Sequence, residues 1–164
     1  MLEIIVIAHN IRSTHNVGSI FRTCEGFGVK QLILSGYTPY PTLPDDPRLP
    51  HIAQKLTDQI HKTALGAETM VHFTHTDQPP LAELTQAGYR LVALEQAARS
   101  IPLQNYHIST KIALLLGEEV SGIAPELIGQ CDDVVEIPMF GRKESFNVSV
   151  STGIALYTLR TGSA

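Results

Sequence analysis

The strongest constraint on the fold is a series of short, almost entirely apolar runs along the chain. An exposed sheet face would require alternating polar residues, so runs of this kind are typical of strands buried on both faces of a parallel sheet. The sequence therefore predicts six such strands. They cover residues 2–8, 31–34, 70–73, 90–94, 112–116 and 134–137.

Helical patterns separate the predicted strands. Apolar residues recur at helical spacing between Val17 and Cys24, and further helices are predicted over residues 52–65, 81–87, 125–129 and 148–159. The alternation predicts an α/β layered fold, a single domain over residues 1–164, with a central parallel sheet. Residues 36–50 contain too many prolines for a regular element and are predicted to form a long loop.

Composition narrows the class of protein. With 43% apolar and 17% charged residues, the 164-residue chain can bury a full core. No membrane span or signal peptide is recognisable, so we expect a cytoplasmic protein. Cys24 and Cys131 are interpreted as reduced thiols, and His72 and His75 lack the further ligands of a metal site, so no metal is expected.

The net charge of −4 is unevenly distributed. Residues 65–140 contain three Lys or Arg and ten Asp or Glu, whereas residues 1–30 and 141–164 together contain six and three. A modest basic patch is therefore expected where the chain ends meet, and the overall charge does not exclude RNA as a partner.

Common nucleotide-binding motifs are absent. There is no P-loop, and Gly26-Phe27-Gly28 follows a predicted helix and precedes a strand, the reverse of the dinucleotide-binding order. Turn glycines at the end of a helix explain this pattern better. Because ligands of open α/β sheets bind outside the carboxyl ends of the strands, the candidate segments are those that follow the last three strands.

Three segments carry the candidate site residues. Asn16, Gly18 and Arg22 follow the first strand, Leu116-Gly117 and Glu119 end the fifth, and Ser145-x-Asn147-x-Ser149 precedes the last helix. Each has an ordinary structural explanation on its own, since Asn and Ser cap helices and Gly permits turns. Gly117 would also let a flat ligand approach the backbone.

Together, these segments resemble the three motifs of the SpoU (TrmH) family of RNA ribose 2′-O-methyltransferases, in the SPOUT class. The resemblance covers essentially the whole chain, and the order of the motifs matches. It implies a fold with a C-terminal trefoil knot, S-adenosylmethionine as cofactor, tRNA or rRNA as substrate, and a homodimer whose active sites use residues of both subunits. No added RNA-binding domain is expected, which favours tRNA.

The resemblance also implies roles for single residues. Arg22 would act on the ribose 2′-hydroxyl with the support of Asn16, and Glu119, Ser145 and Asn147 would complete the catalytic set. A guanidinium is a poor base at neutral pH, so we expect Arg22 to act by electrostatic stabilisation. The implied cofactor-binding residues are Leu94, Leu116, Gly117, Glu118, Ile137, Met139, Ser145 and Phe146.

Glu118 and Phe146 depart from the residues usual in the family, which alters the charge and the shape of the expected cofactor pocket. Two alternatives remain open at this point. A SPOUT enzyme that methylates a base would share the motifs, and a catalytically silent RNA-binding protein could share the fold. The complete set of Arg22, Glu119 and Asn147 favours an enzyme.

Overall fold

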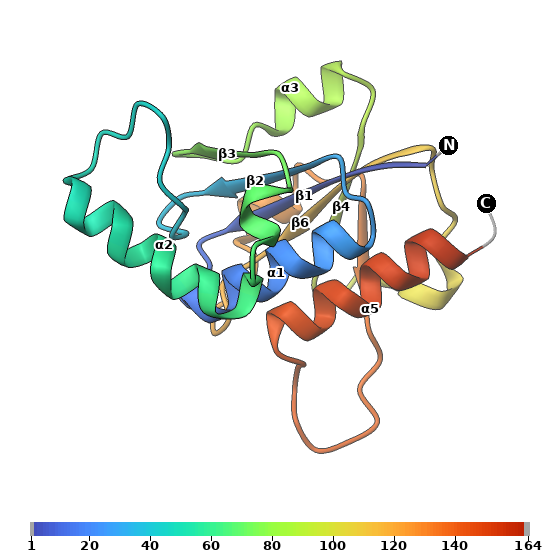
Figure 1. Cartoon of the computed structure of the whole chain (residues 1–164). Coiled ribbons are helices and arrows are strands. Elements are labelled where there is room, and N and C mark those ends of the chain that lie inside the picture. Colours follow the sequence, from blue (N-terminus) through green and yellow to red (C-terminus); the bar gives the residue numbers. More distant parts are fainter. Residues whose placement is uncertain (1, 163–164) are drawn as a thin grey trace.

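A parallel sheet of seven strands forms the centre of the protein, which is described here over residues 2–162 of a computed structural model (Figure 1). The strand order across the sheet is β3-β2-β1-β6-β4-β7-β5. The strands are β1 (Glu3–His9), β2 (Gln31–Ser35), β3 (Phe73–Thr76), β4 (Arg90–Leu94), β5 (Ile101–Pro102), β6 (Lys111–Leu116) and β7 (Asp133–Glu136).

The predicted parallel sheet is confirmed, but the prediction of six strands was wrong. The extra strand, β5, has only two residues and pairs with β7 at the sheet edge, too short to produce an apolar run. The third strand begins at Phe73 instead of Met70. A 3-10 turn over Ala67–Thr69 (η1) delays it, because the Val71 N–H bonds back to the Ala67 carbonyl.

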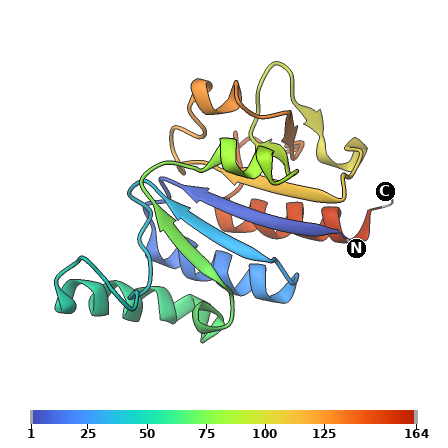
Figure 2. The same cartoon turned by 90° about the horizontal axis from the view of Figure 1, so that it is seen from above.

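Helices cover both faces of the sheet. One face carries α1 (Thr14–Gly26), α2 (Pro50–Ala64) and α5 (Val148–Thr161), and the other carries α3 (Leu81–Gln86) and α4 (Pro125–Ile128), as Figures 1 and 2 show. A second 3-10 turn spans Leu103–Asn105 (η2). No helix within residues 2–162 is both long enough and apolar enough to cross a membrane.

Strand β1 shows why the apolar runs have no polar alternation. Ile4 and Val6 point into the core beneath α1 and α5, whereas Ile5 and Ile7 point into the core beneath α3 and α4. Both faces of the strand are therefore buried, as the sequence predicted. Cys24 and Cys131 are free thiols in these two separate cores.

The proline-rich segment is an ordered loop that ends at Leu49, the residue before α2. Its conformation is fixed by Arg48, which forms an ion pair with Asp46 and donates hydrogen bonds to the carbonyls of Tyr40 and Pro41. Arg48 also lies over the Tyr40 ring, 3.5 Å from its centroid. Tyr40 in turn stacks on His75 of β3, with ring centroids 4.0 Å apart, which holds the loop against the edge strand of the sheet.

Gly18 allows α1 and α2 to pack closely. A Cβ atom at this position would lie 2.1 Å from the Thr63 hydroxyl and 2.3 Å from the Ile60 carbonyl oxygen. The same threonine donates a hydrogen bond to the His15 carbonyl, 2.8 Å away. The small residue therefore serves packing within one chain.

Substituting Gly18 by Ala should lower the free energy of unfolding by about 1–3 kcal/mol, because the added methyl group forces the two helices apart. Urea denaturation measures this change. Gly26→Ala in the same helix is the matched control, since nothing lies within 4 Å of its added Cβ. Equal stability of the two variants would show that the close contact is not needed.

Candidate active site

A cleft opens where the carboxyl ends of β4, β6 and β7 meet the start of α5. We call it the strand-end cleft; it consists of adjoining cavities of about 320 and 70 Å³ that share Leu94, Ser145 and Phe146 in their walls. The larger volume is within the usual range for small-molecule sites, about 300–1,000 Å³. The walls include every predicted cofactor-binding residue: Leu94, Leu116, Gly117, Glu118, Ile137, Met139, Ser145 and Phe146.

The loop after β6 is shaped by two glycines. Glu118 and Gly122 exchange backbone hydrogen bonds of 3.1 and 2.9 Å, which folds the loop back on itself. A Cβ at Gly117 would lie 2.5 Å from the Gly122 carbonyl carbon, and Gly122 has a φ of +69°. Gly117 is thus required by the loop itself, before any ligand approach is considered.

The Glu119 carboxylate joins three parts of the chain. Its oxygens accept hydrogen bonds from the backbone N–H groups of Arg12 (3.1 Å) and Ser13 (3.2 Å) and from the Asn16 side-chain amide (2.9 Å). Burial raises the pKa of Glu119, but these donors outweigh burial and hold the pKa below its ordinary value. The carboxylate is therefore ionised and fully engaged near neutral pH.

The network continues to the start of α5. The Asn147 side-chain amide donates to the Asn16 side-chain oxygen over 3.1 Å, and the Asn147 side-chain oxygen accepts from the Ser149 N–H over 2.9 Å. Asn147 thus caps α5, as its residue type suggested, but Asn16 does not cap α1. Ser13 is that cap, accepting from the Asn16 N–H, which leaves the Asn16 side chain free to reach Glu119.

We refer to the carboxylate of Glu119, the side chains of Asn16 and Asn147, and the N–H groups of Arg12 and Ser13 as the Glu119 network. The network borders the strand-end cleft, because Glu119 itself lines the larger cavity. The network contains three of the five predicted catalytic residues, Asn16, Glu119 and Asn147. A fourth, Ser145, lies in the wall of the same cleft.

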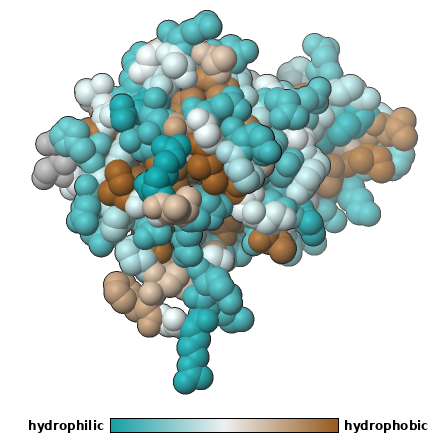
Figure 3. All heavy atoms as spheres, turned by 180° about the vertical axis from the view of Figure 1, so that it is seen from behind, coloured by the Kyte–Doolittle hydropathy of each residue, from teal (hydrophilic) through white to brown (hydrophobic). Residues whose placement is uncertain are grey.

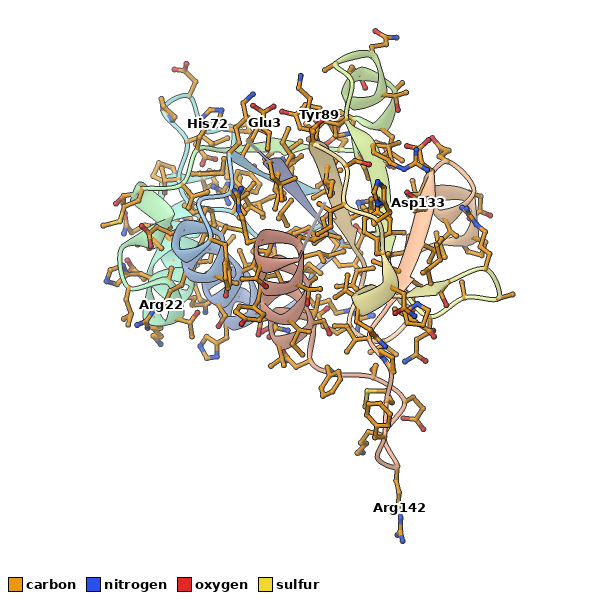
Figure 4. All side chains as sticks on the ribbon, turned by 90° about the vertical axis from the view of Figure 1, so that its right-hand side faces the viewer. Glu3, Arg22, His72, Tyr89, Asp133 and Arg142 are labelled. Carbon is orange, nitrogen blue, oxygen red and sulfur yellow. The ribbon has the colours of Figure 1, made fainter. Side chains whose placement is uncertain are left out.

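Arg22 is the predicted residue that the fold does not bring to this cleft. It is exposed on α1 and lines a separate groove with Thr23 and Gly153, and Figure 4 shows it at the surface near α2. Six residues separate it from Asn16, which corresponds to about 240° around the helix and about 9 Å along its axis. Within one chain, Arg22 and the strand-end cleft are therefore apart.

The cleft is strongly acidic. Its walls contain five carboxylates, from Glu95, Glu118, Glu119, Glu136 and Glu144. Glu118 forms an ion pair with Arg12, and its pKa is lowered by the Ser121 hydroxyl and by the Arg12 guanidinium. Such a field favours a cationic ligand.

The walls fit the cofactor implied by the motifs. S-adenosylmethionine carries a sulfonium and an ammonium group, which suit the carboxylates, and its adenine suits apolar walls. Leu116, Ile137 and Met139 provide such walls in the two cavities. No group of three or more metal-binding side chains occurs within residues 2–162.

The segment between β7 and α5 projects from the body of the protein. Figure 1 shows it extending beyond α5, Figure 3 shows a hydrophilic tip from behind, and Figure 4 places Arg142 at this tip. Phe140 is 97% exposed on the same segment. The base of the segment is tied to the cleft by a 2.7 Å hydrogen bond from the Gln96 side chain to the Glu144 carbonyl.

Sequence reasoning missed two residues of this site. Glu95 follows β4 directly and accepts the Ile123 N–H (2.9 Å), which fixes the loop over the cleft. Arg12 follows β1 and pairs with Glu118. Both residues follow a strand closely in the sequence, and this position could have identified them, because parallel strands end at one edge of the sheet.

Comparison with known proteins agrees with this geometry. The profile of the SpoU rRNA Methylase family matches residues 3–157. A tRNA (guanosine(18)-2′-O)-methyltransferase of Aquifex aeolicus is 31% identical over 94% of this chain and 67% of its own length. A 23S rRNA (guanosine-2′-O-)-methyltransferase RlmB of Acinetobacter baylyi is 30% identical over 90% of this chain. This chain spans only 55% of that second relative.

Solved structures show the same fold. The AdoMet-bound rRNA methyltransferase from Sinorhizobium meliloti superimposes with a TM-score of 0.80 at 25% identity, over 96% of this chain and 56% of its own. The TrmH/SpoU tRNA modifying enzyme of A. aeolicus gives a TM-score of 0.79 at 27% identity, over 98% and 75%. Because the family profile matches residues 3–157 of the 164, the chain belongs to the SpoU rRNA Methylase family.

Proposed function

We propose that this protein transfers a methyl group from S-adenosylmethionine to a ribose 2′-hydroxyl of RNA. The observation that carries the proposal is the convergence of all eight predicted cofactor-binding residues on the strand-end cleft, with the Glu119 network at its border. The relatives named above act on tRNA and on 23S rRNA. We expect tRNA as the substrate, because this chain matches 67% of a tRNA enzyme and 55% of an rRNA enzyme. We expect the cytoplasm as the compartment, since tRNA and rRNA are this protein's proposed substrates.

Residues of the chain would hold the cofactor as follows. Leu116, Ile137 and Met139 would pack against the adenine, and the carboxylates of the cleft would attract the positive charges. When bound, the cofactor supplies an activated methyl group on sulfur, whose transfer to an oxygen requires alignment but no metal. Backbone groups after β4, β6 and β7 would fix its orientation.

Glu119 would hold the side chains of Asn16 and Asn147 in place and would not act as a base. Its carboxylate already accepts three hydrogen bonds and has a lowered pKa, so it is a poor proton acceptor. Its effect is to fix the amide of Asn16, whose oxygen in turn orients Asn147. Asn16 and Asn147 would then present fixed polar groups to the ribose.

Arg22 would enter the site from a second subunit. It is exposed, six residues from Asn16 along α1, and turned away from its own cleft. On α5 next to it, Val150 and Tyr157 are 49% and 60% exposed, which is typical of a helix face that packs against another protein surface. A two-fold dimer through α1 and α5 would cover these residues and bring Arg22 to the partner's cleft.

The trefoil knot also remains a proposal. It is supported by the strand order, in which β6 lies between β1 and β4 and β7 lies between β4 and β5, and by the Gln96–Glu144 contact between the segments after β4 and before α5.

Product analysis tests the proposed reaction. The purified protein, S-adenosylmethionine and total RNA from cells that lack this gene should yield a 2′-O-methylated nucleoside, detected by mass spectrometry after digestion. Calorimetry with S-adenosylhomocysteine, in the presence of a chelator, should show binding at one molecule per chain. A base-methylated nucleoside would instead favour the base methyltransferase, and cofactor binding without transfer to any RNA would contradict the proposed activity.

Arg22→Ala should lower methyl transfer by about 100-fold or more while cofactor binding is retained, because one preorganised cation near the reacting oxygen is lost. Asn147→Ala should also be strongly impaired. If the sites are shared, heterodimers of the two variants contain one site with both residues intact. Differently tagged chains, co-expressed and purified through both tags, should therefore recover about half of the wild-type rate per dimer.

The matched control is a heterodimer of wild type with the Arg22→Ala, Asn147→Ala double variant, which contains no site with both residues intact if the sites are shared. An inactive heterodimer of the two single variants would contradict the shared site, as would a monomer at micromolar concentration in sedimentation.

A further inference from the structure

A second concave surface lies beside the strand-end cleft. This surface, which we call the Tyr37 groove, has a volume of about 590 Å³ and is formed by the β1–α1 loop, the segment after β2 and one side of α2. Its walls include Arg12, His15, Tyr37, Pro39, Leu56 and Gln59. Apart from Arg12, whose N–H belongs to the Glu119 network, none of these residues has a place in the reaction described above.

The groove and the cleft adjoin at Arg12. The Arg12 side chain lines the groove, while its guanidinium pairs with Glu118 and its N–H donates to Glu119, both of which line the cleft. A ligand in the groove would therefore lie next to the methyl donor. The Arg12 side chain is still 65% exposed, and a guanidinium has five N–H donors, so it can bind a further anion.

Tyr37 offers a flat ring at the end of a fixed turn. The side chain is 55% exposed, yet its backbone N–H is held by the Asn10 side-chain oxygen over 3.1 Å. Asn10 and Gly36 both have positive φ values, +57° and +65°, and a Cβ at Gly36 would lie 1.9 Å from that same oxygen. The turn that presents Tyr37 is therefore fixed, and the ring is available to a ligand.

The floor of the groove is also assembled in advance. Tyr40 stacks on His75 with ring centroids 4.0 Å apart, and Arg48 covers its other face. His75 also hydrogen-bonds to the Gly36 carbonyl over 3.1 Å, so it is part of this floor. Arg48 is engaged by Asp46 and by two carbonyls, which leaves Arg12 as the cation that faces a ligand.

The flat aromatic and apolar walls suit an unstacked base, and the one exposed guanidinium suits the phosphate of the same nucleotide. In RNA, aromatic side chains stack on bases that are splayed out of single strands, whereas the base faces of a helix are covered. We propose that the Tyr37 groove binds an unpaired nucleotide of the RNA substrate, with its base against Tyr37 and its phosphate on Arg12. The inference rests on the proposed function and narrows the substrate to an unpaired segment.

Kinetics of Tyr37 variants test this binding site. With total RNA from cells that lack the gene as substrate, Tyr37→Ala should raise the KM for RNA at least about fivefold, the loss expected for one base stack. The KM for S-adenosylmethionine should stay unchanged. Tyr37→Phe should restore the wild-type value, because it keeps the ring.

Arg12→Gln provides a second variant, with Lys111→Gln as its matched control. Both remove one positive charge, but Lys111 lies at the amino end of β6, the opposite edge of the sheet. Arg12→Gln should raise the KM for RNA several-fold more than the control does. Mapping of the methylated nucleotide should place it in, or next to, an unpaired segment.

Several outcomes would overturn the inference. They are a wild-type KM for RNA in Tyr37→Ala, a Tyr37→Phe variant as impaired as Tyr37→Ala, equal effects of Arg12→Gln and Lys111→Gln, or a target inside a continuous helix. In each case methyl transfer by the wild-type protein would leave the proposed function intact. If the wild-type protein transferred no methyl group to RNA, this result would contradict the proposed function, and the proposed role of the Tyr37 groove would fail with it.

Discussion

The hydrogen bonds of the Glu119 carboxylate are the interaction on which the site depends. They connect the loop after β6 with the first turn of α1 and, through Asn16, with the start of α5. The first turn of α1 lies more than a hundred residues from each of the other two segments in sequence, and the parallel sheet brings the three together only at its carboxyl edge. Without this carboxylate, the donors of α1 and the amides of Asn16 and Asn147 would lose the group that orients them.

The same arrangement places two residues of one sequence motif on different sides of the protein. Asn16 and Arg22 lie on one helix, yet the helical rotation turns one toward the cleft and the other toward the exposed side of α5. A single chain therefore presents the strand-end cleft on one side and its proposed catalytic cation on another. The proposed dimer follows from this separation and from the exposed apolar residues of α5.

Much of the fold was predictable because burial on both faces leaves a simple trace in the sequence. The apolar runs located β1, β2, β4, β6 and β7 within a residue or two. β5 left no trace because two residues at a sheet edge need no apolar run, and β3 was displaced because Met70 and Val71 belong to the turn that follows η1.

The sequence predicted which residues line the strand-end cleft, but it did not predict their contacts. Capping was the ordinary structural explanation for Asn16, but Ser13 caps the helix and Asn16 binds a carboxylate from another loop. For Gly117 the sequence left two explanations, a turn and the approach of a ligand, and the structure shows that the loop itself requires glycine. Long-range partners such as Arg12 and Glu118 cannot be paired from spacing, because their contact depends on strand order.

The most direct measurement is a crystal structure of the protein with S-adenosylhomocysteine. The account predicts the ligand in the strand-end cleft, with its adenine among Leu116, Ile137 and Met139 and its sulfur facing the side of the cleft formed by Glu119 and Asn147. The same crystal would show whether a second chain places its Arg22 at that cleft. Ligand bound elsewhere, with the strand-end cleft left to solvent, would contradict the account.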